Sequence, residues 1–98
     1  MTIPRIEWDA DKALGNMRKH GVSFEEAQTV FEDEEALLIP DPEHSVREER
    51  FVLLGLSSAL RVLVVVHCER ERGNVIRVIS ARKADAQERR LYADRRAS

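Results

Sequence analysis

Several features common in enzymes and membrane proteins are scarce in this 98-residue sequence. It contains one cysteine, Cys68, so it has neither an internal disulfide nor a cysteine-based zinc site. Its four glycines stand alone, which excludes the glycine-rich loops that bind nucleotide phosphates. The longest apolar run, residues 62–66, is five residues long, whereas a transmembrane helix needs about twenty. These absences argue against ATP-dependent chemistry, hydride transfer and a membrane-spanning protein.

Metal ligands and export signals are also lacking. His20, His44 and His67 share no spacing that one helix or strand could use to hold a metal, so we expect no metal and no cofactor. Residues 1–5 lack the apolar segment of a signal peptide. We therefore expect a cytoplasmic protein that does not associate with a membrane.

What remains is a charged, moderately hydrophobic chain. Charged residues make up 35% and hydrophobic residues 43% of the sequence, so we expect residues 1–98 to form a single globular domain. Residues 1–45 hold 4 basic and 11 acidic side chains, whereas residues 46–98 hold 12 basic and 7 acidic ones. Eleven of those 12 basic residues are arginine, whose planar guanidinium suits phosphate. This uneven distribution of charge along the sequence either is due to chance or indicates a basic face that binds a polyanion.

Two helices are predicted near the N-terminus. Asp9 can cap the first, and the cations that precede Gly21 are typical of its C-terminal end. Ser23 with Glu26 forms a capping-box pattern at the start of the second. The acidic run at residues 32–35 marks a solvated turn after that helix.

The second half of the chain changes to the alternation of strands. The strands expected are residues 3–8, 37–39, 50–56, 60–68 and 75–82. Residues 84–95 predict a final helix with Leu91 and Tyr92 in the core. This order indicates an α+β fold. We expect a small antiparallel four-stranded sheet, plus a short N-terminal strand, packed against two N-terminal helices and a C-terminal helix.

Arginines inside the predicted strands are the first candidates for a site. Arg50 and Arg77 alternate with apolar residues, and a charged side chain there is costly unless it is paired, exposed or at a cleft. An ion pair with Glu48 or Glu49 fits the pattern as well as a cleft does. Strict alternation places Arg77 and Arg82 on opposite faces, so a shared site requires Arg82 to leave the strand.

The junction of the last strand and the last helix is a second candidate. Arg82 and Lys83 stand beside a helix N-terminus, where free N–H groups and the helix dipole attract anions. The alternative is a salt bridge from Arg82 to Asp85 or Glu88.

Three residues of the first helix are further candidates. Lys19 and His20 close that helix, where they either cap its dipole or, for His20, supply a general acid. Lys12 lies one turn before Asn16, and we expect the two to share a solvated face.

Two groups of residues resemble the signatures of a known family. The first comprises Trp8-Asp9, Lys12, Asn16, Lys19-His20-Gly21-Val22, Phe24 and Ala27. The second comprises Ile79-Ser80-Ala81-Arg82-Lys83-Ala84, Glu88-Arg89 and Tyr92, with Glu49-Arg50 and Gly55 between the two groups. Together they span nearly the whole chain and resemble the BrnT family, the toxins of bacterial type II toxin–antitoxin systems.

This resemblance implies a RelE-like ribonuclease fold and an endoribonuclease that arrests translation. It also implies a cognate antitoxin, resembling BrnA, that forms a dimer of heterodimers with the toxin and contacts operator DNA through its own domain. By position it points to Lys12, Lys19, His20, Glu49, Arg50 and Arg82. The strand pattern adds Arg77, and the strand–helix junction adds Lys83.

RNA carries its own nucleophile, the 2′-hydroxyl, so cleavage can proceed without a metal. The candidate catalytic residues are His20, Glu49, Arg50, Arg77 and Arg82, and the candidate RNA-binding residues are Lys12, Lys19 and Lys83. Arg77 and Arg82 would stabilise the phosphorane and Arg50 would position phosphate. Glu49 would serve as base and His20 as acid, which yields a 2′,3′-cyclic phosphate and a 5′-hydroxyl.

The competing hypothesis is a non-catalytic binding module. In that case the basic half of the chain binds an acidic protein partner or a nucleic acid without cleaving it. The net charge of −2 disfavours tight non-specific RNA binding, because neutralising phosphates requires a locally basic surface.

Overall fold

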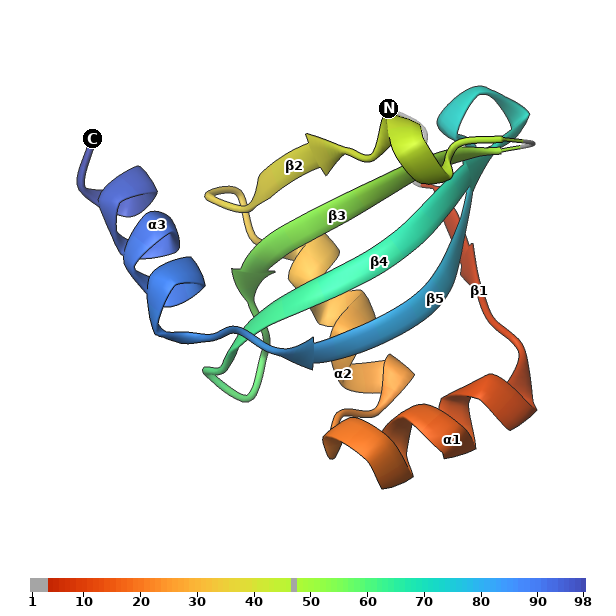
Figure 1. Cartoon of the computed structure of the whole chain (residues 1–98), viewed down its shortest axis with the longest axis horizontal. Coiled ribbons are helices and arrows are strands. Elements are labelled where there is room, and N and C mark those ends of the chain that lie inside the picture. The colour runs from red at the N-terminus through yellow and green to blue at the C-terminus, as the bar shows by residue number, and fades with distance from the viewer. Residues whose placement is uncertain (1–3, 47) are drawn as a thin grey trace.

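A computed structural model describes residues 4–46 and 48–98. These residues form one five-stranded sheet, in the order β1-β5-β4-β3-β2, and three α-helices (Figure 1). The elements are β1 (Arg5–Glu7), α1 (Ala10–His20), α2 (Phe24–Thr29), β2 (Leu37–Pro40), β3 (Glu49–Leu56), β4 (Val62–Arg70), β5 (Val75–Lys83) and α3 (Ala86–Ala97). Single 3-10 turns lie at Val30–Glu32, Pro42–His44 and Glu71–Gly73. None of the helices in this part of the chain is long and apolar enough to span a membrane.

The predicted α+β class is confirmed, with one change to the sheet. The four expected antiparallel strands correspond to β2, β3, β4 and β5. The N-terminal strand β1 joins the same sheet parallel to β5, so the sheet is mixed. Ile3, which the sequence pattern predicts to begin this strand, lies outside the described residues.

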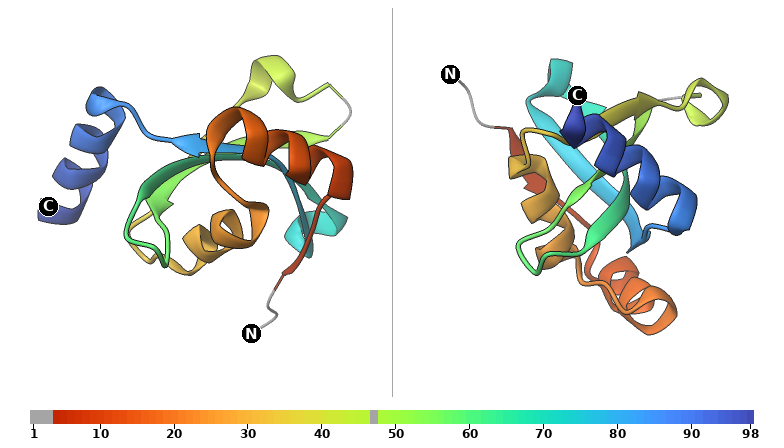
Figure 2. Two further views of the ribbon diagram at one scale, coloured as in Figure 1. Left: turned by 90° about the horizontal axis from the view of Figure 1, so that it is seen from below. Right: turned by 90° about the vertical axis from the view of Figure 1, so that its left-hand side faces the viewer.

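The helices divide the sheet into a covered face and an open face. On the covered face the core consists of Val22, Phe24, Ala27, Val30, Leu53, Leu63, Val65, Val78 and Ala81. The open face, which carries Arg50, Val52 and Leu54 of β3 and Val64, Val66 and Cys68 of β4, meets α3 at one end only. There Ala84 and Tyr92 pack on Leu54 and Val64. Figure 2 shows α3 standing at that end of the sheet, which leaves the rest of the open face without a helix.

A β-bulge in β5 changes which of its side chains share a face. The register between β4 and β5 shifts after Val66, so β5 carries one extra residue at this point. Arg77 therefore pairs with Cys68, and Arg82 pairs with Val64. Both arginines lie on the open face while Arg82 remains inside β5. The expectation of opposite faces is wrong, because strict alternation does not account for a bulge.

Asn16 joins α1 to the edge of β5. The short strand β1 pairs only with the first three residues of β5, so it does not reach Ala81. The Asn16 side chain takes its place: Nδ2 donates to the Ala81 carbonyl (2.8 Å) and Oδ1 accepts from the Ala81 N–H (3.1 Å). Nδ2 also donates to the Val22 carbonyl (2.9 Å). Asn16 is 8% exposed, so the expected solvated position is wrong for this residue.

Two further expectations are modified by packing. Tyr92 is buried as expected, whereas Leu91 is 49% exposed, because α3 covers only one end of the sheet. Ser23 caps α2 by accepting from the Glu26 N–H (3.0 Å), but the Glu26 carboxylate pairs with Arg61 instead of completing the capping box.

Replacing Asn16 tests how much its hydrogen bonds to the edge of β5 stabilise the fold. Asn16→Ala should lower the free energy of unfolding by about 3 kcal/mol, because each buried backbone group left unpaired costs about 1–3 kcal/mol. The matched control is Asn74→Ala, at an exposed asparagine, which should have little effect. Urea denaturation of both variants measures the difference, and equal stabilities would contradict the assigned role.

Two glycines should respond to alanine in opposite directions. A Cβ at Gly55 would lie 2.8 Å from both Ala36 Cβ and Val30 Cγ1, whereas a Cβ at Gly15 of α1 meets nothing within 4 Å. Gly55→Ala should therefore cost about 1–3 kcal/mol through overpacking. Gly15→Ala should add about 0.5–1 kcal/mol of helix stability. Thermal unfolding of the two variants checks the sign of each change.

Candidate functional site

A hollow of about 300 Å³ on the open face brings together residues that are far apart in sequence. Its lining residues are Lys12, His44, Val46, Glu48, Arg50, Cys68 and Ile79. The strand register explains the central group, because Arg50 pairs with Cys68 across β3 and β4, and Cys68 pairs with Arg77 of β5. The hollow therefore lies between α1, the loop before β3 and the three central strands.

Arg50 and Lys12 supply the positive charge of this hollow. Among the described residues, no carboxylate lies within ion-pair distance of either side chain. The Nε of Arg50 is buried, and no atom of the described residues accepts its hydrogen. A buried donor without an acceptor is unfavourable. An anion that enters the hollow would relieve this cost, so the site suits a phosphate or carboxylate.

The neighbouring arginines are already paired. Glu7 lies 3.6 Å from both Arg70 Nη1 and Arg77 Nη1. Glu48 accepts hydrogen bonds from Arg70, one of them 3.0 Å from Nη2, and this bond holds the pKa of the Glu48 carboxyl below its usual range. These pairs nearly neutralise one side of the hollow and leave Arg50 and Lys12 available.

Arg82 lies further along the open face and is held by α3. Its Nη1 and Nη2 each donate to the Glu88 carboxylate at 2.8 Å. This bidentate pair, more than any other contact, lowers the pKa of Glu88 to about 2. Asp85 caps α3 instead of pairing with Arg82, so of the two salt bridges proposed from the sequence the one to Glu88 forms. The planar guanidinium of Arg82, which binds this carboxylate through two hydrogen bonds, has the geometry to bind a phosphate in its place.

Other predicted site residues lie away from the hollow. Glu49 faces the covered side beside Glu69, where burial first and then the Glu49 charge raise the pKa of Glu69. Lys83 pairs with Leu63 of the core, so it also points to the covered side. Lys19 and His20 end α1 and do not line the hollow. The structure thus brings together Lys12, Arg50 and Arg77, with Arg82 on the same face, but not the predicted base and acid.

Several residues that line the hollow were not among those predicted from the sequence. Cys68 lies opposite Arg50, and burial raises the pKa of its thiol, so it is not a thiolate nucleophile at neutral pH. His44 donates from Nδ1 to both oxygens of Asp41, at 2.9 Å and 3.0 Å. The spacing Asp-Pro-x-His in a turn is the signal that could have identified this pair. The strand register could have identified Cys68.

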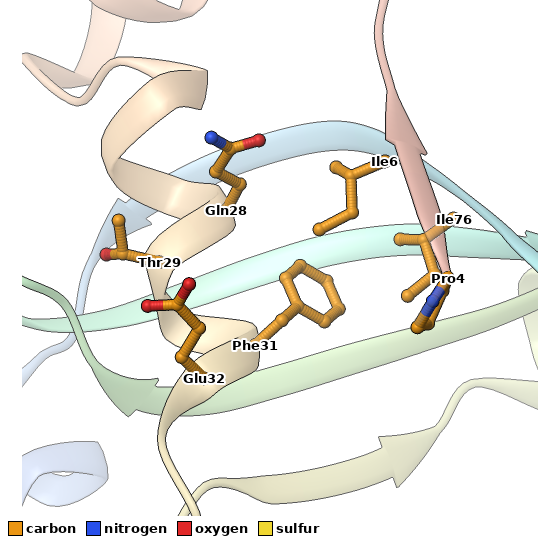
Figure 3. Close-up of a pocket in the computed structure, with 7 residues that line it drawn as sticks. All are labelled: Pro4, Ile6, Gln28, Thr29, Phe31, Glu32 and Ile76. Atoms are coloured by element: carbon orange, nitrogen blue, oxygen red, sulfur yellow. The ribbon is translucent and has the colours of Figure 1, made fainter. Parts of the chain in front are cut away.

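A second cavity, of about 400 Å³, lies on the covered side (Figure 3). It is lined by Pro4, Ile6, Gln28, Thr29, Phe31, Glu32 and Ile76. Among the described residues of this lining, the only charged group is the carboxylate of Glu32, which does not suit an anion. The candidate site is therefore the hollow on the open face.

These features define a small α+β protein with a candidate anion site on an open sheet face. Residues 8–88 match the family model described as "Ribonuclease toxin, BrnT, of type II toxin-antitoxin system", and the chain belongs to this family. The structure also resembles the crystal structure of the Brucella abortus ribonuclease toxin BrnT. The TM-score is 0.65 and the identity 24%, over 85% of this chain and 99% of that one, which shows a shared fold. No curated protein matches the chain. The family resemblance found in the sequence is confirmed.

Acid should weaken the Arg82–Glu88 pair over a defined pH range. The pKa of Glu88 is about 2 in the folded protein against an ordinary 4.5, so the pair stabilises the fold fully above pH 4.5 and loses its effect as the pH falls toward 2. Glu88→Gln should cost about 1 kcal/mol or less at pH 7, because the Arg82 side chain is 44% exposed. Urea denaturation should show this difference shrink on acidification. The control Glu25→Gln removes an exposed carboxylate that has no ion-pair partner among the described residues, so it measures the effect of losing a charge alone.

Proposed function

We propose that this protein is an endoribonuclease that binds RNA on its open face and cleaves it without a metal ion. The observation that carries this proposal is the buried, unsatisfied Nε of Arg50 beside Lys12 in an open hollow. Such a donor favours an anionic oxygen, and RNA presents one at every phosphate. Membership in a family of ribonuclease toxins supports the same activity.

The proposed mechanism uses the arginines of the open face. Arg50 and Lys12 hold the scissile phosphate, and the 2′-hydroxyl of the adjacent ribose attacks the phosphorus. Arg77 stabilises the charge that develops on the phosphorane. Arg82 contributes to this stabilisation when a phosphate oxygen displaces Glu88.

The products of this reaction are a 2′,3′-cyclic phosphate and a 5′-hydroxyl. Lys19, at the end of α1, and Lys83, at the end of β5, would contact RNA that continues past the edge of the open face.

The family also implies a partner, because a type II toxin is neutralised by an antitoxin. We further propose that this antitoxin resembles BrnA, that the two proteins form a dimer of heterodimers, and that operator DNA is contacted through the antitoxin. We also propose that the protein acts in the cytoplasm, where it arrests translation, and that its fold is of the RelE-like type.

A binding module without catalysis is the second candidate. One observation favours it: Arg70, Arg77 and Arg82 are already paired with carboxylates, so the open face is less cationic than its arginine content suggests. In such a module the hollow would bind a carboxylate of a protein partner.

Removal of Arg50 separates the two candidates. Arg50→Ala should lower RNA cleavage by about 10²-fold or more, since it removes a group that contacts the reacting phosphate. Arg90→Ala, at an exposed arginine of α3, is the matched control and should cleave normally. The measurement is cleavage of a defined RNA by antitoxin-free protein in EDTA, with the new ends mapped.

Three results would contradict the proposal, the first two its mechanism and the third the enzymatic activity itself. A 5′-phosphate end would contradict the use of the 2′-hydroxyl. Cleavage that EDTA abolishes would contradict metal independence. Intact RNA, together with a loss of partner binding by Arg50→Ala, would favour the binding module.

A further inference from the structure

The loop before β3 presents a histidine–aspartate pair to the hollow. Nδ1 of His44 lies 2.9 Å and 3.0 Å from the two carboxylate oxygens of Asp41. A carboxylate only accepts hydrogen bonds, so Nδ1 carries the proton. Nε2 is then the nitrogen with the free lone pair, and among the described residues nothing hydrogen-bonds to it. The His44 side chain is 60% exposed and lines the hollow, so a bound RNA can reach it.

Hydrogen bonds attach this turn directly to Arg50. The Asp41 N–H donates to the Arg50 carbonyl (2.9 Å). The Arg50 N–H donates to Ser45 Oγ (2.9 Å), which itself donates to the Asp41 carbonyl (2.7 Å). The turn at Pro42–His44 therefore lies beside the start of β3 (Figure 1). A phosphate held by Arg50 would lie next to the imidazole of His44.

The other titratable groups of the hollow are poor proton acceptors. Glu48 is engaged by Arg70, which lowers the pKa of its carboxyl and hence its basicity. Cys68 is a thiol of raised pKa. Lys12 is a cation and has no lone pair to offer while charged. The imidazole of His44, in contrast, has a nitrogen lone pair that can accept a proton, and the carboxylate bound to its other nitrogen orients the ring for this role.

We propose that His44, oriented by Asp41, is the general base of the cleavage reaction; this inference rests on the proposed ribonuclease function. Nε2 of His44 takes the proton of the 2′-hydroxyl as the bond from that oxygen to phosphorus forms. The bond between phosphorus and the 5′-oxygen breaks, and its electron pair stays on that oxygen, which takes a proton from water. The imidazolium then releases its proton to solvent. His44 thus performs the step predicted from the sequence for Glu49.

The test measures cleavage and binding separately in two variants, with a neighbour as control. His44→Ala should cleave about 10²- to 10⁴-fold more slowly, the usual contribution of a general base. Exogenous imidazole should restore part of that activity. Asp41→Asn should be slowed by a smaller factor, because Asp41 acts through His44, to which its carboxylate is hydrogen-bonded. Glu43→Gln, an exposed position in the same turn, should cleave like wild type.

Binding of a 2′-O-methyl RNA, which has no attacking hydroxyl, distinguishes the possible outcomes. His44→Ala should bind it as wild type does, with an unchanged melting temperature. Wild-type cleavage that persists in His44→Ala, or an activity loss that imidazole does not reverse, would overturn the role of His44 alone. Loss of binding in His44→Ala would make it a binding residue and also overturn the proposal. A wild-type protein that leaves RNA intact would overturn the proposed function as well.

Discussion

The hydrogen bonds between the Asn16 side chain and the backbone of Ala81 support the rest of this structure. The β1 strand is too short to complete the edge of β5, and an unpaired edge inside the protein would leave backbone groups unsatisfied. By imitating a strand, Asn16 closes this edge and holds α1 alongside β5. Lys12, one helical turn earlier, thereby reaches the hollow on the open face. One buried amide thus connects the fold to the candidate site.

The open face combines paired and unpaired cations, and this balance decides what the site can do. Carboxylates of Glu7, Glu48 and Glu88 neutralise the arginines around the hollow. They leave Arg50, whose Nε is buried without an acceptor, as the strongest attraction for an anion. A face with every arginine free would bind polyanions more tightly but less selectively. In this structure the positive charge without a carboxylate partner is instead concentrated at Arg50, in the hollow that His44 also lines.

The sequence predicted what depends on local pattern. The caps at Asp9 and Gly21, the class of fold and the family all followed from residue order and spacing. The site was predicted only in part, because it depends on pairing between strands. Alternation placed Arg77 and Arg82 on opposite faces, and the bulge in β5 puts them on the same face. The pairing of His44 with Asp41 depends on the conformation of a turn, which apolar periodicity does not describe.

The central claim is that the Arg50 guanidinium binds a phosphate of RNA. The most direct measurement follows the arginine Nε–H signals by NMR while a 2′-O-methyl oligonucleotide is added. The account predicts that the Arg50 signal shifts and saturates with binding, whereas the signal of Arg90 on α3 does not move. Binding of the oligonucleotide with no change at Arg50 would contradict the account.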